Sequence, residues 1–112
     1  MIVATTDEVS GQRIVRTLGL VRGNSVRGRH LGRDIMAALR NLVGGEIPEY
    51  TKLIAEAREQ ALDRMVAEAR ELGADAVVAV RFSTAELTRG AAELLAYGTA
   101  VVLLPEALEK AS

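Results

Sequence analysis

The chain has 112 residues, a formal net charge of −1 and no cysteine. This length predicts one domain, and the near-neutral charge gives no general attraction to nucleic acid or to an anionic membrane. The missing cysteine excludes disulfides, thiolate metal sites and a cysteine nucleophile. No apolar run approaches the roughly 20 residues of a membrane span, and Met1–Thr6 lacks the features of a signal peptide. We therefore expect a soluble cytoplasmic protein.

The first part of the chain predicts two strands and a helix. Met1–Thr5 is short, β-branched and apolar, which favours a strand, and Asp7–Gly11 is a polar turn. Ile14–Arg29 predicts one long strand that is bent or bulged at its glycines. Leu31–Val43 places apolar residues on one face and predicts a helix, which Gly44–Gly45 ends. The glycines of the long strand are Gly19, Gly23 and Gly28.

The longest element predicted is a helix over Pro48–Leu72. Its apolar residues recur at steps of three and four and form one stripe. Pro48 suits a first helical position, and Gly73 suits the left-handed residue that closes a helix. Some 25 residues at about 1.5 Å each give a rod of roughly 38 Å, long enough to span the whole domain. The stripe consists of Tyr50, Leu53, Ile54, Ala57, Ala61, Met65, Ala69 and Leu72.

Two further strands complete the chain. Ala76–Phe82 and Leu94–Leu104 are apolar at nearly every position, with Gly98 as a possible bulge. Thr88–Ala92 contains a glycine and predicts a hairpin loop. Pro105 ends the last strand, so we expect a single domain over residues 1–104 and a polar tail over 105–112.

The order ββααββ predicts an α+β fold with a mainly antiparallel four-stranded sheet and both helices on one face. Ala76–Val80 and Leu94–Leu104 have the pattern of strands that are covered above and below. No predicted element remains for the second face. We therefore expect another copy of the chain to cover it, in an obligate homo-oligomer.

Arginines gather where the long second strand meets the following helix. Between Arg22 and Arg40 there are five arginines and one acid. The guanidinium fork suits carboxylate or phosphate, and a helix N-terminus attracts anions. This pattern favours a site for a small anionic ligand. The alternative is that these arginines pair with acids of the long helix or of a neighbouring subunit. The candidate ligand-binding residues are Arg27, Arg29, Arg33 and Arg40.

Motifs for other chemistry are lacking. Arg29–His30 stands where a phosphate loop needs Lys-Ser/Thr, and no G-x-G-x-x-G occurs. His30 is the single histidine, so a histidine-dependent triad would have to use it, and a metal site with several histidines cannot form within one chain. The three aromatic residues are not interleaved with the arginines, which disfavours nucleic-acid binding. We expect no cofactor and no metal ligands, and find no residue set for catalysis.

The short motifs together resemble the YbjQ-like family of small bacterial and archaeal proteins, sometimes labelled heavy-metal-binding. The resemblance covers Met1 to about Leu103 and implies a dodecin-like α+β domain assembled into a homopentameric ring. It implies no catalytic residues, and Ser83 stands where relatives often carry Asp. The motifs are Ile2–Thr6, Leu18-Gly19, Arg27-Gly28-Arg29, Gly32-Arg33-Asp34, Leu39-Arg40-Asn41, Gly44-Gly45-Glu46, Tyr50, Glu56-Ala57-Arg58, Leu72-Gly73-Ala74, Val80-Arg81-Phe82 and Ala96-Tyr97-Gly98-Thr99-Ala100.

These observations lead to one functional hypothesis and one alternative. The first is a non-enzymatic ring, pentameric by the resemblance, that binds a small anionic ligand or acts as a scaffold. Its expected partners are copies of itself and that ligand, with neither nucleic acid nor membrane. The alternative is binding of a divalent or heavy metal, as the family label implies.

Overall fold

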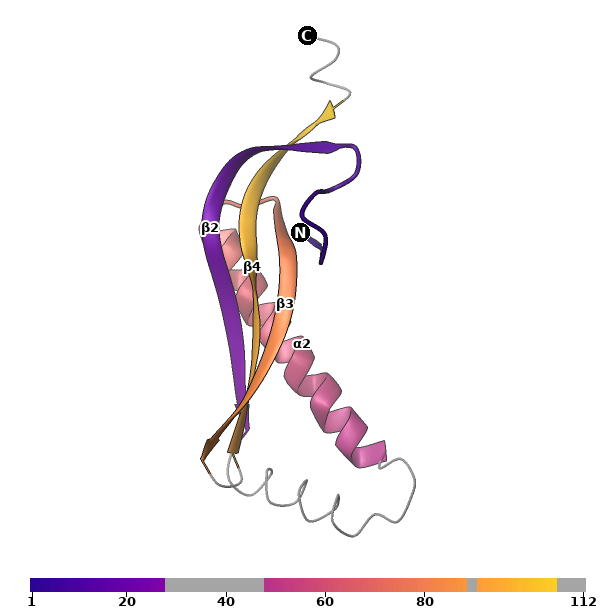
Figure 1. The fold of residues 1–112 in the computed structure, drawn as a ribbon, viewed down its shortest axis with the longest axis vertical. Coiled ribbons are helices and arrows are strands. Elements are labelled where there is room, and N and C mark those ends of the chain that lie inside the picture. The colour runs from indigo at the N-terminus through magenta and orange to yellow at the C-terminus, as the bar shows by residue number, and fades with distance from the viewer. Residues whose placement is uncertain (28–47, 89–90, 107–112) are drawn as a thin grey trace.

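The computed structural model describes residues 1–27, 48–88 and 91–106. These residues form four strands and one helix in the order β1, β2, α2, β3, β4 (Figure 1). The predicted α+β class is thus confirmed, and the elements within the described ranges follow the order ββαββ, compared with the predicted ββααββ. The helix predicted over Leu31–Val43 lies outside the described residues. The elements are β1 Ile2–Val3, β2 Gln12–Arg27, α2 Pro48–Glu71, β3 Ala76–Thr88 and β4 Ala91–Pro105.

The sheet is mixed, so the prediction of a mainly antiparallel sheet is wrong. Its strand order is β1-β3-β4-β2, with β1 parallel to β3 and the other two pairs antiparallel. The reason is that β1 and β2 are consecutive in sequence but lie at opposite edges. Residues 4–11 carry the chain across between them, and this crossing turns β1 to run alongside β3 (Figure 1).

Helix α2 confirms the prediction for Pro48–Leu72 to within one residue. It crosses behind one face of the sheet (Figure 1) and buries a stripe of small residues with one larger side chain, Met65. Gly73 has φ 81°, and its N–H donates to the Arg70 carbonyl at 3.0 Å while that of Ala74 donates to Ala69 at 3.1 Å. These two bonds satisfy free carbonyls at the helix end. The buried core around the stripe contains Val21, Ala61, Met65, Ala69, Val77, Val80, Ala96 and Ala100.

The opposite face of the sheet carries a second, smaller core at one end. Ala76, Val78 and Val101 are buried there, and Val9 and Ile14 pack against them. The prediction that no element remains for this face is therefore wrong in part. The N-terminal segment and the curved start of β2 cover it locally, which no local sequence pattern could reveal. Beyond this end, the described part of the chain leaves Leu20 and Val26 exposed on this face.

The bulges lie partly where the glycines predict them. Gly19 has φ 122° beside a register shift between Thr17 and Gly19. Gly98 is not itself the bulge: the register of β3 shifts between Val78 and Arg81. A Cβ at Gly98 would lie 2.7 Å from Val77 Cγ1. The missing side chain therefore leaves room for a bulge on the neighbouring strand.

Candidate functional site

The predicted arginine site lies at the far end of β2. Arg27 is the last residue of that strand, and its backbone pairs with Ala92 of β4. The side chain of Arg27 and the whole of Arg29, Arg33 and Arg40 lie outside the described residues. The structure thus places the start of the candidate site and leaves the grouping of the four arginines a prediction.

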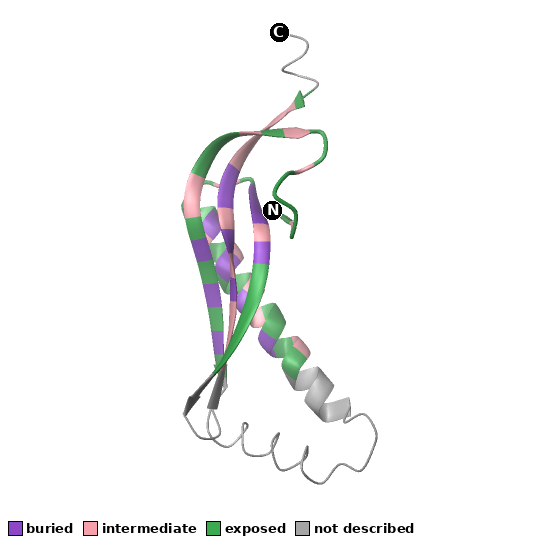
Figure 2. Cartoon of the chain, viewed as in Figure 1, coloured by how far each residue is buried: buried purple, intermediate pink, exposed green. Residues whose placement is uncertain are grey.

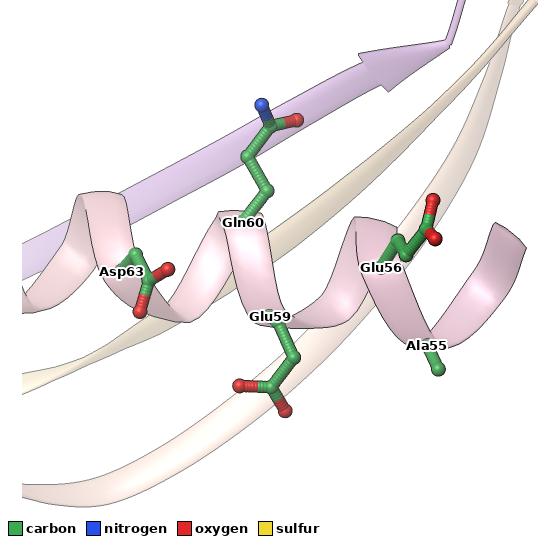
Figure 3. Close-up of a pocket in the computed structure, with 5 residues that line it drawn as sticks. All are labelled: Ala55, Glu56, Glu59, Gln60 and Asp63. Atoms are coloured by element: carbon green, nitrogen blue, oxygen red, sulfur yellow. The ribbon is translucent and has the colours of Figure 1, made fainter. Parts of the chain in front are cut away.

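A group of polar residues fixes the strand just before Arg27. Ser25 is fully buried under α2, and its hydroxyl donates to Gln60 Oε1 at 2.8 Å. Figure 3 shows the Gln60 side chain directed toward β2. A buried hydroxyl that lacked a partner would cost about 1–3 kcal/mol, so this bond sets the position of the strand against the helix.

Two further bonds hold the neighbouring residue, Asn24. Arg64 Nη1 of α2 donates to the Asn24 carbonyl at 2.5 Å, and Asn24 Nδ2 donates to Glu93 Oε2 of β4 at 3.2 Å. We call Asn24, Ser25, Gln60, Arg64 and Glu93 the seam cluster, because it joins β2 to both neighbours. It anchors the end of β2, of which Arg27 is the last residue.

The sequence reasoning missed the seam cluster. Its hydrogen-bonded pairs lie 35 to 69 positions apart, so no local spacing links the partners. One signal was present in β2. The alternate positions Val21, Gly23 and Ser25 face the helix, and a serine in an apolar alternation requires a partner.

A shallow depression lies on α2 and is lined by acidic residues. Figure 3 shows that Glu59 and Gln60 point to opposite sides of the helix, with Glu56 and Asp63 a turn away on either side. The carboxylates do not converge, and no group of three or more potential metal-ligating residues occurs among the described side chains. The lining residues are Ala55, Glu56, Glu59, Gln60 and Asp63.

A third surface is the sheet face that points away from α2. Figure 2 shows buried and exposed residues alternating along β2. The exposed members of this alternation include Leu20 and Val26, which are 64% and 49% exposed. We call this surface the open face. Away from the second core, its residues on the described strands are Leu20, Arg22, Asn24, Val26, Arg81, Ser83, Ala85, Glu93, Leu95, Tyr97 and Thr99.

Comparison with known proteins agrees with this two-layer α+β architecture. A solved structure from Pediococcus pentosaceus, a DUF74-family protein of unknown function, matches with a TM-score of 0.62. The match covers 93% of this chain and 98% of that one at 14% sequence identity. At that identity, the likeness shows the fold alone.

Sequence comparison assigns the family. A family model described as "Putative heavy-metal-binding" matches residues 1–104. A UPF0145 protein of Methanosarcina acetivorans is 56% identical over 104 residues, covering 93% of this chain and 98% of the relative. One from Pyrococcus abyssi is 59% identical over 103 residues, covering 92% and 90%. The chain belongs to the YbjQ family of UPF0145 proteins, as the resemblance predicts.

The donor set of this chain does not fit the metal named in the family description. Heavy metals favour thiolate and imidazole ligands, but the chain has no cysteine and one histidine. The carboxylates of Glu56, Glu59 and Asp63 do not point toward one another (Figure 3). We therefore assign no metal-dependent chemistry to these residues. Within the described ranges, no helix combines the length and hydropathy needed to cross a membrane.

Proposed function

We propose that this protein is a non-enzymatic scaffold whose copies assemble into a closed ring, and that each copy binds a small anionic ligand near the end of β2. The observation that carries the proposal is the open face. This face presents Leu20 and Val26 of β2 to solvent, at 64% and 49% exposure. The other face of the same strand is buried under α2.

The dimensions of a single chain support assembly. It measures 63 × 26 × 15 Å, with a Cα radius of gyration of 18.1 Å. A compact domain of this length has a radius of gyration of about 13 Å. A thin, extended slab that exposes the apolar side chains of Leu20 and Val26 gains by stacking on another copy. The pentameric number comes from the family resemblance.

The ligand class follows from the charges of β2 and the segment after it. The strand Gln12–Arg27 contains four arginines and no acidic residue, and Arg29, Arg33 and Arg40 follow in sequence. Guanidinium groups bind carboxylate and phosphate with two parallel hydrogen bonds. The seam cluster holds the strand that presents Arg27. We therefore expect a small carboxylate or phosphate compound, bound once per subunit.

Native mass spectrometry of untagged, undialysed protein tests both parts of the proposal. We expect a pentamer that carries extra mass in multiples of one small molecule. The variant Arg27→Ala/Arg29→Ala/Arg33→Ala should assemble but lose that mass. The matched control Arg16→Ala/Arg58→Ala/Arg70→Ala removes the same charge and should retain it.

The possible failures are distinct. A monomeric wild-type protein would contradict the scaffold. Loss of assembly in the triple variant would make the three arginines structural, as in the ion-pair alternative. The third failure is a pentamer that carries no extra mass and shows no thermal shift when inorganic phosphate or citrate is added. That result would contradict ligand binding, while the proposed assembly into a ring would stand.

A further inference from the structure

Three large polar side chains form a row across the open face. Tyr97 of β4 is the register partner of both Arg22 on β2 and Arg81 on β3. Opposed residues on antiparallel strands share one face, with Cβ atoms about 5 Å apart. Both arginines are exposed, and the 64%-exposed Leu20 is on the same face. Arginine and tyrosine are enriched at the centres of protein interfaces, so this row suits a protein partner.

The outer surface of α2 has the opposite charge. Ala57, Ala61 and Met65 bury the inner side of the helix against the sheet. The exposed acids Glu56, Glu59 and Asp63 line the depression described above, with Ala55 between them. We call this the acidic helix surface. Its charge is complementary to that of the exposed Arg22 on the open face, whereas Arg81 Nη1 donates to the Thr5 and Val80 carbonyls of its own chain.

The charges discriminate between two ways of stacking copies. If two open faces met across a two-fold axis at this row, the arginines of one copy would oppose those of the other. Glu93, the acid on this face, lies beyond the row and accepts a hydrogen bond from Asn24 Nδ2 of its own chain. Like charges in such contacts cost several kcal/mol. Against the acidic helix surface the same arginines meet carboxylates.

We infer that the open face of one copy packs on the acidic helix surface of the next copy. The inference rests on the proposed self-assembly and names its two surfaces. The contact is heterologous, because it joins different surfaces of identical chains, and such contacts close into rings when the rotation between copies allows it. It also covers both faces of every sheet, as the apolar pattern of β3 and β4 requires.

Cysteine cross-linking tests this contact directly, because the natural chain contains no cysteine. We would make Leu20→Cys/Glu59→Cys and Leu20→Cys/Asp63→Cys, together with each single variant, and oxidise the assembled proteins with diamide. The double variants should give a ladder of covalent oligomers on a denaturing gel, ending at the ring size. The single variants should remain monomeric, because each presents a thiol on one side of the contact.

The outcomes separate this inference from the proposed function. Dimers from Leu20→Cys alone would mean that open faces meet each other, and would overturn it. Intact oligomers without cross-links in either double variant would also overturn it, while self-assembly would stand. A monomeric wild-type protein would instead remove the proposed function.

Charge reversal gives an independent check. Arg22→Glu, and separately Glu59→Arg/Asp63→Arg, should each raise the concentration at which the assembly dissociates by roughly tenfold. The three changes combined should recover most of that loss, because the ion pairs are restored with reversed sign. Arg58→Glu, on the same helix but outside the depression, is the control. If the dissociation concentration of the combined variant rose by the product of the separate increases, the charges would not interact, and the contact would be contradicted.

Discussion

Gly23 of β2 lies directly against the backbone of α2 at Ala61. A Cβ on this glycine would come 2.2 Å from the Ala61 carbonyl oxygen and 2.3 Å from the Met65 amide nitrogen. Both obstacles are helix backbone, which cannot rotate away. The helix therefore approaches the sheet as closely as it does because one residue has no side chain.

Gly23→Ala should destabilise the protein by about 3 kcal/mol, since insertion into a close-packed contact forces the helix away from the strand. Urea unfolding monitored by circular dichroism measures the change. Gly11→Ala is the comparison: nothing lies within 4 Å of its added Cβ, but its φ is 75°, so only conformational strain of about 1–2 kcal/mol is expected. Equal losses in the two variants would show that crowding at Ala61 is not the cause.

Local patterns were sufficient to predict much of this fold. The apolar stripe and Gly73 predict α2 and its end, because periodicity and left-handed glycines are properties of a few consecutive residues. The glycines of β2 also predict irregularity, and Gly19 has it. Gly23 shows the limit of such reasoning, because its role depends on a helix 38 positions later in the chain.

The second face of the sheet shows the same limit. An apolar pattern on both faces of β3 predicts cover on both sides but does not name the covering element. Part of that cover is Val9 and Ile14 of the same chain, brought there by a crossing that leaves no local signal. For the candidate site, sequence indicated the arginines. It could not indicate that Ser25 and Gln60 would anchor the strand that carries Arg27.

Ala79 stands in the left-handed region, at φ 53°, within the bulge of β3. A side chain at this conformation costs roughly 1–2 kcal/mol, whereas glycine adopts it freely but loses more entropy on folding. Ala79→Gly should therefore stabilise the protein by about 0.5 kcal/mol in urea unfolding. Ala67→Gly, at an exposed position of α2, should instead destabilise it by about 1 kcal/mol. A loss at both positions would contradict the strain assigned to Ala79.

Metal binding can be tested against the family description. Untagged protein purified without chelator should contain less than about 0.1 equivalent of any transition metal by elemental analysis, because the chain lacks the thiolates and histidine clusters of strong sites. Addition of Zn²⁺, Cu²⁺ or Cd²⁺ should leave the unfolding temperature unchanged. One equivalent of metal per chain, lost in His30→Ala, would show that the ligands come together in the assembled ring.

Arg81 holds the N-terminal segment over the second core. Its Nη1 donates to the carbonyls of Thr5 and Val80, both at 2.8 Å. Beside it, the amides of Ala79 and Val80 donate to the carbonyls of Thr6 and Ala4, at 2.8 and 3.0 Å. Loss of the guanidinium should free the segment without unfolding the sheet, since the long β2–β4 pairing is separate from these contacts.

Arg81→Ala should therefore accelerate hydrogen exchange at the Ala4, Ala79 and Val80 amides by roughly tenfold, which corresponds to about 1.4 kcal/mol of local opening. Amides in the central part of β4 should keep their protection. Arg81→Lys is the matched control, because it retains the charge but not the planar fork. Its exchange rates at these amides should fall between those of the wild type and of Arg81→Ala. Uniformly faster exchange across the sheet would mean that Arg81 supports the whole fold rather than this segment.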